Sequence, residues 1–165
     1  MARLGRGRRL APMAQVTLLC GPSCAGKSTL ARELEASGAL VLSYDREAWA
    51  RGVRDGRPPQ ALMAQIDADF LELLERVLPT GRPVVLDASL STRAVRDRWR
   101  MRLGAMAVEC ELVVVRAPLP TLLDRAHGRE PGPESVVLDD AALTAYVAGF
   151  EWPGKREAHR LVETG

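Results

Sequence analysis

The sequence predicts an α/β fold in which about five short parallel strands form one sheet that is covered by helices on both faces. Short apolar segments alternate with segments of helical periodicity along most of the 165 residues. The apolar segments are hydrophobic along their whole length, as in parallel strands that are buried on both sides. In addition, a glycine-containing turn, residues 21–28, separates the first strand from the first helix.

The first strand is expected over residues 15–20, where Gln15 is followed by five mostly apolar residues. A helix is expected over residues 28–37, because Leu30 and Leu34 lie four residues apart on one face and Gly38 provides a C-terminal stop. This unit therefore has the order strand, glycine turn, helix.

The same alternation continues to the end of the chain, and turn-forming residues separate the elements. We expect further strands over 39–43 and 83–87, within 109–115 and within 158–163. Helices are expected over 46–50, 61–78 and 118–127. Two more helices are expected, one that begins after a cap at Ser91 and one that begins after a cap at Asp139 or Asp140.

The turn fits the pattern G-x-x-x-x-G-K-[ST] in the position where that pattern binds phosphate. Successive backbone N–H groups and the positive end of the helix dipole converge there. The pattern predicts that Lys27 contacts the β- and γ-phosphates of ATP and that the Ser28 hydroxyl binds Mg²⁺. The alternative is a glycine turn that binds nothing. The predicted nucleotide-binding residues are Gly21, Ser23, Cys24, Ala25, Gly26, Lys27, Ser28 and Thr29.

Two carboxylates follow predicted strands, and in parallel sheets ligands bind at the carboxyl ends of the strands. Asp87 is expected to bind Mg²⁺ or its waters; the alternative is a helix cap. Asp45 is expected to take the proton of an acceptor hydroxyl as a general base; the alternative is an N-cap for residues 46–50.

Arg125 and Arg129 lie one turn apart, before a Gly- and Pro-rich segment. Such a segment can close over a nucleotide and exclude water, so we expect a lid near residues 126–137 with Arg125 and Arg129 on the phosphates. Solvated surface arginines are the alternative. Arg93, Arg96 and Arg100 share one face of the helix after Ser91, and this face suits either a nucleic-acid backbone or plain solvation.

Bulk composition is typical of one globular domain, with 47% hydrophobic and 27% charged residues. No apolar run is long enough to span a membrane, and no apolar stretch follows the N-terminal arginines as a secretory signal would require. We therefore expect a cytoplasmic protein. Residues 1–12 contain four arginines and no acid, so we expect a basic flexible leader there and a single domain over 13–165.

Together these features resemble the small P-loop kinases related to phage polynucleotide kinase 5′-kinase domains. The resemblance covers residues 14–163 and is carried by residues 21–29, Asp45, 84–90, 125–129 and 150–153. It implies a three-layer P-loop fold, with Asp45 as the general base, Arg129 as the lid arginine on the phosphates and Asp87 on the acceptor and metal side.

This sequence departs from that family at the acceptor. Polynucleotide members have an arginine three residues after the base, where this chain has Ala48, and an asparagine two residues after the third-strand aspartate, where it has Ser89. Both departures leave the ATP site intact.

The sequence thus predicts an ATP-dependent phosphotransferase that moves the γ-phosphoryl group to a hydroxyl acceptor. A polynucleotide 5′-hydroxyl is one candidate, with nucleic acid as the partner. A sugar, nucleoside or antibiotic is the alternative, and a nucleotide-dependent switch or ATPase partner without an acceptor is a third reading. A basic groove reaching Arg93, Arg96 and Arg100 would favour nucleic acid, whereas a closed pocket would favour a metabolite.

Overall fold

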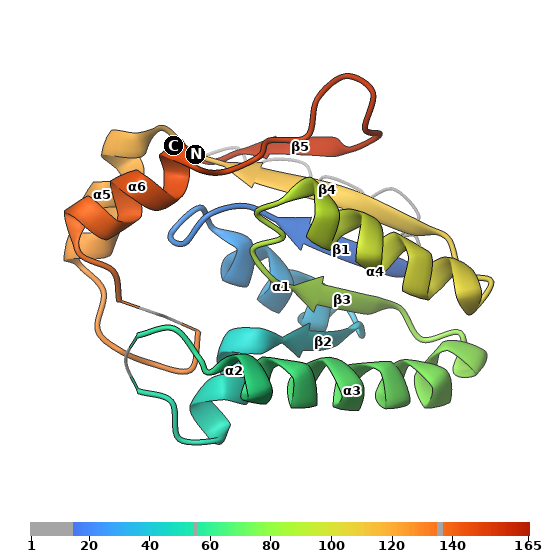
Figure 1. The fold of residues 1–165 in the computed structure, drawn as a ribbon. Helices are drawn as coiled ribbons and strands as arrows, with labels where there is room; N and C mark the ends of the chain where they lie inside the picture. The colour runs from blue at the N-terminus through green and yellow to red at the C-terminus, as the bar shows by residue number, and fades with distance from the viewer. Residues whose placement is uncertain (1–14, 55, 135–136) are drawn as a thin grey trace, which may run out of the picture.

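One parallel sheet organises the chain in the computed structural model, which describes residues 15–54, 56–134 and 137–165. The leader expected over residues 1–12 lies outside the described residues. The strand order is β2-β3-β1-β4-β5, and every neighbouring pair is parallel (Figure 1). The strands are β1 (Val16–Cys20), β2 (Leu40–Ser43), β3 (Val84–Asp87), β4 (Cys110–Arg116) and β5 (Arg160–Glu163).

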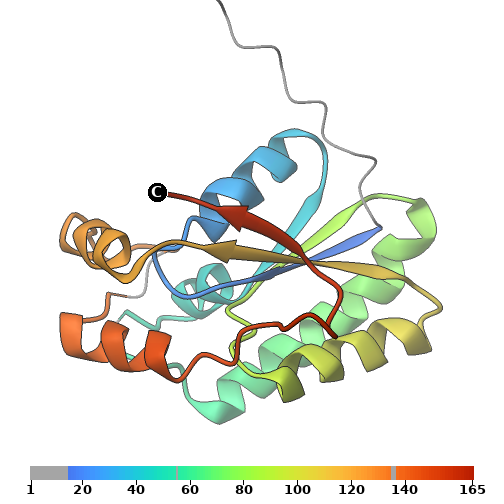
Figure 2. The same cartoon turned by 90° about the horizontal axis from the view of Figure 1, so that it is seen from above.

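Hydrophobic residues of the central strands are buried on both faces of the sheet. Leu18 of β1 belongs to one buried cluster and the next residue, Leu19, to the other, because side chains alternate along a strand. Figure 2 shows α1 on one face and α3 and α4 on the other. The three-layer P-loop fold predicted from the sequence is confirmed.

The helices have nearly the expected bounds and differ mainly in their N-terminal caps. They are α1 (Lys27–Ala36), α2 (Tyr44–Ala50), α3 (Gln60–Val77), α4 (Arg93–Ala105), α5 (Leu119–His127) and α6 (Asp140–Ala148), with a short 3₁₀ turn, η1 (Leu78–Thr80), after α3. Asp139 caps α6, as one of the two expected residues. The expected cap of α4 at Ser91 is wrong: Thr92 accepts the bond from the Val95 N–H. The Ser91 carbonyl instead accepts the Glu151 N–H, which ties this turn to the C-terminal part of the chain.

One face of α4 carries a buried ion-pair cluster. Glu157, 5% exposed, accepts two hydrogen bonds from the guanidinium of Arg96, which is 1% exposed, and one from Arg100. Arg96 also donates to the Leu90 carbonyl at 2.9 Å. The face carrying Arg93, Arg96 and Arg100 is therefore not simply solvated, because its middle arginine is inside the protein. The acid responsible lies 61 residues away in the chain.

Replacing Glu157 with Gln is expected to lower the free energy of unfolding by about 3–5 kcal/mol, because Arg96 would stay buried and charged without its partner. Urea unfolding at neutral pH measures this loss. Glu111→Gln is the matched control, since it removes an exposed partner of Arg160 and should cost at most about 1 kcal/mol. Equal effects of the two substitutions would contradict the assignment.

The same cluster predicts how stability depends on pH. Burial alone would raise the pKa of Glu157, but hydrogen bonds and charge from Arg96 and Arg100 lower it to about 2. A glutamate in the unfolded chain has a higher pKa than this. The stabilisation is therefore complete above the pKa of the unfolded state and is lost as the pH falls toward about 2, the pKa of the folded state. When the free energy of unfolding is measured as the pH is lowered, Glu157→Gln should lack this acid-dependent loss of stability.

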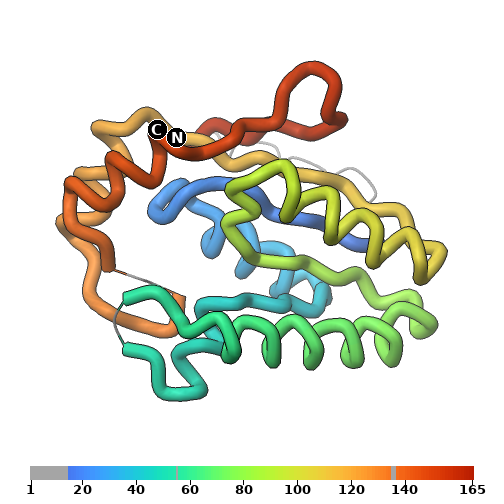
Figure 3. Tube along the Cα trace, viewed as in Figure 1, coloured from blue at the N-terminus to red at the C-terminus, as the bar shows by residue number. Residues whose placement is uncertain are grey.

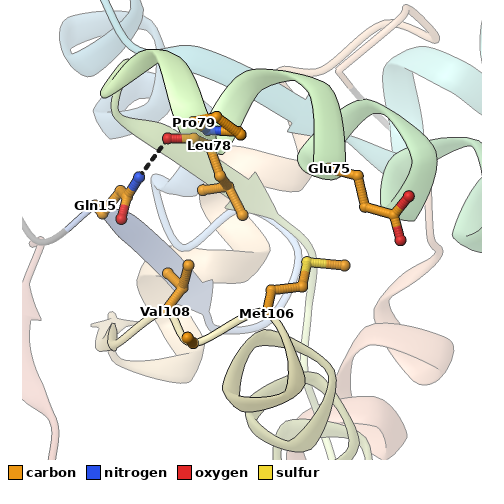
Figure 4. A pocket seen from close by; sticks show the side chains of 7 residues that line it. Gln15, Glu75, Leu78, Pro79, Met106 and Val108 are labelled. Carbon is orange, nitrogen blue, oxygen red and sulfur yellow. Dashed lines mark hydrogen bonds between the residues drawn. The ribbon is translucent and has the colours of Figure 1, made fainter.

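A shallow hollow of about 430 Å³ lies at the amino-terminal edge of the sheet, around Gln15, Leu78, Met106 and Val108 (Figure 4). Gln15 donates to the Leu78 carbonyl beside it at 2.7 Å. Residues 21–28 follow the other end of β1, so this hollow is remote from the predicted nucleotide site. None of the described helices combines the length and apolar character that a membrane crossing needs.

Candidate functional site

The turn over residues 21–28, called here the phosphate loop, is held close to the central strands. The Gly21 N–H donates to the Ser89 carbonyl at 3.0 Å. A Cβ atom on Gly21 would lie 2.3 Å from the carbonyl oxygen of Val115, so no larger residue fits there without moving β4. Gly26 has φ 103°, in the left-handed region that favours glycine, and directly precedes α1.

Gly21→Ala is therefore expected to destabilise the protein by about 1–3 kcal/mol, because the new methyl group meets a backbone carbonyl of a central strand. Urea unfolding measures the change. The control is Gly104→Ala within α4, where a Cβ meets nothing within 4 Å and alanine is the better helix former. If Gly21→Ala unfolds at the same urea concentration as the wild type, β4 can shift to accommodate the methyl group without loss of stability.

Lys27 is the first residue of α1, and its ammonium lies over the phosphate loop. Its Nζ donates to the Pro22 carbonyl at 2.9 Å. Burial lowers the pKa of Lys27, whereas the charges of Asp87 and Asp45 raise it. The residue as a whole has intermediate exposure.

Thr164 supports the phosphate loop from the end of the chain. Its hydroxyl donates to the Ala25 carbonyl at 2.6 Å and accepts from Arg125 at 3.0 Å. The Arg125 guanidinium also donates to the Cys24 carbonyl at 3.2 Å. Arg125 thus binds the back of the loop in this structure, and its predicted role on the phosphates remains a prediction. Thr164 was missed from the sequence, although its place after a parallel strand puts it on the same edge.

Asp45 follows the end of β2 by two residues and Asp87 ends the neighbouring strand β3, with Ser43 opposite Asp87. Asp87 is buried and accepts a hydrogen bond from the Ser43 hydroxyl at 3.3 Å. Ser43 also caps α2 by accepting the Arg46 N–H, so neither aspartate has the capping role considered above. Asp45 instead lies in the first turn of α2, where the helix dipole favours its charge.

The ionisation of Asp45 is shifted by its surroundings. The residue as a whole is exposed, but protein around the carboxylate removes water and raises its pKa. Lys27 opposes this shift, Asp87 reinforces it, and Arg129 opposes it. A raised carboxylate pKa suits a group that must accept a proton.

Arg129 lies just after α5 and reaches the phosphate loop, with its Nη1 3.5 Å from the Cys24 Sγ. Its charge influences the pKa of Lys27 and of Asp45. The structure thus brings Lys27, Asp45, Asp87 and Arg129 to one edge of the sheet, as expected. Their individual roles remain predictions.

The residues at this edge also fit a magnesium ion. Mg²⁺ prefers oxygen ligands and is usually bound through one or two carboxylates together with substrate phosphates. Asp87 and the Ser28 hydroxyl offer such oxygens beside the phosphate loop. No group of three or more His, Cys, Asp or Glu side chains that could hold a metal occurs within residues 15–54, 56–134 and 137–165. Any Mg²⁺ bound here would take its other ligands from the nucleotide and from water.

Comparison with known proteins identifies the family of the chain. A family profile described as an AAA domain matches residues 16–153. No curated protein matches the chain by sequence. Among solved structures, a gluconokinase from Sinorhizobium meliloti 1021 is 18% identical with a TM-score of 0.63, and the match covers 93% of this chain and 84% of that one.

Two other solved structures are similar to the chain over most of its length. Kti12 from Chaetomium thermophilum, in complex with ADP-AlF3, is 18% identical with a TM-score of 0.61, covering 91% of this chain and 88% of that one. A chain of the Pnkp1/Rnl/Hen1 RNA repair complex is 16% identical with a TM-score of 0.70, covering 86% of this chain and 45% of that one. The protein therefore belongs to the AAA domain family and has a P-loop kinase-like fold.

Proposed function

We propose that the protein is an ATP-dependent phosphotransferase that moves the γ-phosphoryl group to a hydroxyl acceptor. The observation that carries this proposal is the placement of Asp45. It follows the end of β2 beside Asp87 at the end of β3, on the edge that holds the phosphate loop, and its carboxylate interacts electrostatically with Lys27 and Arg129. A P-loop protein that only binds nucleotide has no need of a proton acceptor at this position.

The described residues suit each part of such a reaction. The phosphate loop and Lys27 hold the triphosphate, and Mg²⁺ bound at Ser28 and Asp87 would neutralise charge on its oxygens. Asp45 orients the acceptor hydroxyl and takes its proton. The hydroxyl oxygen then forms the new bond to the γ-phosphorus, while the bond to the β–γ bridging oxygen breaks and ADP leaves. Arg129 stabilises charge on the transferring group.

For the acceptor, we propose a small hydroxyl compound ahead of a polynucleotide end, because two positions that would serve a nucleic acid are buried. A nucleic-acid groove along α4 would need Arg96, but this residue is buried against Glu157. Ala48, at the position where polynucleotide members have an arginine, is 5% exposed and packs in the core. Both observations count against a nucleic-acid contact at these two positions, whereas Arg93 and Arg100 on the same helix remain partly exposed.

The test is acceptor-stimulated ADP formation in a coupled assay with Mg-ATP. Sugars, nucleosides and aminocyclitols are compared with 5′-hydroxyl DNA and RNA oligonucleotides of equal concentration. We expect at least one small acceptor to stimulate ADP release above the rate without acceptor. Stimulation by oligonucleotides alone would restore the polynucleotide reading, and no stimulation by any acceptor would favour a switch or ATPase.

A further inference from the structure

The predicted lid covers residues 126–137, of which 135 and 136 lie outside the described residues. Its described part, residues 126–134 and called here the lid segment, contacts both sides of the candidate site. At one end, the Arg129 guanidinium reaches the phosphate loop at the Cys24 Sγ. Five residues later, the Glu134 carboxylate accepts two hydrogen bonds from Arg46 of α2, at 2.7 and 3.0 Å. Figure 3 shows the chain after α5 turning toward α2. Residues 129–134 thus connect the loop to the helix that carries Asp45.

Arg46 directly follows Asp45 and is also held by an acid of α1. Its guanidinium donates to both carboxylate oxygens of Glu35 in α1, at 2.9 and 3.1 Å. These bonds, with those to Glu134, raise the pKa of Arg46. Arg32 of α1 forms a further ion pair with Glu134. Such a network with bidentate geometry restrains its members more than an isolated surface pair does.

Exposure separates the Arg46–Glu134 pair from ordinary surface ion pairs, although the outer members of the network, Arg32 and Glu35, are 56% and 44% exposed. The side chains of Arg46 and Glu134 are 28% and 20% exposed, whereas those of Glu72 and Arg76 on α3 are 71% and 66% exposed with a separation of 4.0 Å. The Arg46–Glu134 pair is therefore partly shielded from water and lies beside the proposed base. No residue of this network belongs to the phosphate loop.

We infer that Glu134 is a positioning residue that latches the lid segment to α2, so that Arg129 and Asp45 take up their places together. This inference rests on the proposed function for its effect on catalysis. Glu134 acts through Arg46 and Arg129 and does not itself touch the reacting atoms. Its loss should therefore slow phosphoryl transfer while ATP binding to the phosphate loop is retained.

The first test is Glu134→Gln, which keeps the side-chain size and removes the charge. With the acceptor that gives the fastest wild-type transfer, kcat should fall about 10- to 100-fold while the Kd for ATP changes less than about twofold. Glu72→Gln is the control and should keep the wild-type kcat. Glu134→Asp keeps the charge and should recover part of the loss. An unchanged kcat in Glu134→Gln, or a loss of ATP affinity as large as the loss of kcat, would overturn the latch.

A double substitution tests whether Glu134 acts through Arg46. If it does, Glu134→Gln combined with Arg46→Gln should be no slower than the slower single variant, because the second change removes an interaction already lost. Fully multiplicative effects would overturn this assignment. They would mean that the two residues act independently.

A second readout does not depend on activity. Hydrogen exchange in the nucleotide-free protein should become faster over residues 126–134 and over α2 in Glu134→Gln, and should not change in Glu72→Gln. If the wild type transfers phosphate but Glu134→Gln shows unchanged hydrogen exchange, the latch is overturned and the proposed function stands. If exchange is faster in Glu134→Gln but the wild type transfers phosphate to no acceptor, the latch is supported and the proposed function is refuted.

Discussion

Asp45→Asn is expected to lower kcat for phosphoryl transfer about 10²- to 10⁴-fold while ATP still binds. Asparagine has nearly the same shape but cannot accept the hydroxyl proton. The nucleotide contacts lie on the phosphate loop, so the Kd for ATP should change little. Asp97→Asn is the control, since Asp97 pairs with Arg93 and Arg100 on α4 and has no proposed catalytic role.

The pH dependence of transfer gives this prediction a second measurement. The base must be ionised to act, and loss of water around its carboxylate raises the pKa of Asp45, so activity should be lost as the pH falls through a value above that of an ordinary aspartate. Residual transfer by Asp45→Asn should lack this acid limb. If the residual activity of Asp45→Asn were lost over the same pH range as that of the wild type, the acid limb would belong to another group.

Lys27→Met is expected to lower kcat/KM about 10²- to 10³-fold and, unlike Asp45→Asn, to weaken ATP binding as well. The ammonium lies over the phosphate loop, where it donates to the Pro22 carbonyl. Lys27→Arg should not restore activity, because a planar guanidinium cannot replace a compact ammonium within a tight loop.

The chain provides its own control for this substitution. Lys155 is the other lysine of the sequence and is exposed. Lys155→Met should therefore leave nucleotide affinity and transfer unchanged. Calorimetric titration with ATP and steady-state kinetics on both variants make the comparison. Wild-type ATP affinity in Lys27→Met would contradict the role of the phosphate loop.

The parts of this site that the sequence could predict are those built from neighbouring residues or from a strand end. Gly21, Lys27 and Ser28 belong to one local motif, and Asp45 and Asp87 follow from the rule that parallel strands end at the same edge. The alternation of strands and helices was likewise enough for the fold class. Each of these inferences needed only local sequence.

The contacts that the sequence could not predict join residues far apart in the chain. Thr164 meets Ala25 across 139 residues, Glu134 meets Arg46 across 88, and Glu157 meets Arg96 across 61. An acid in a charged sequence has many possible partners, and only the three-dimensional fold selects one. For the same reason Arg96 looked like a surface residue on a basic helix face, although Glu157 holds it inside.

The most direct measurement is transfer of label from γ-labelled ATP to a panel of hydroxyl compounds and 5′-hydroxyl oligonucleotides, made with the wild type and Asp45→Asn. We predict label on an acceptor with the wild type, very little with the variant, and equal ATP binding by both. Label released only as inorganic phosphate by the wild type, or wild-type transfer by Asp45→Asn, would contradict the assignment of this protein as a phosphotransferase with Asp45 as its base.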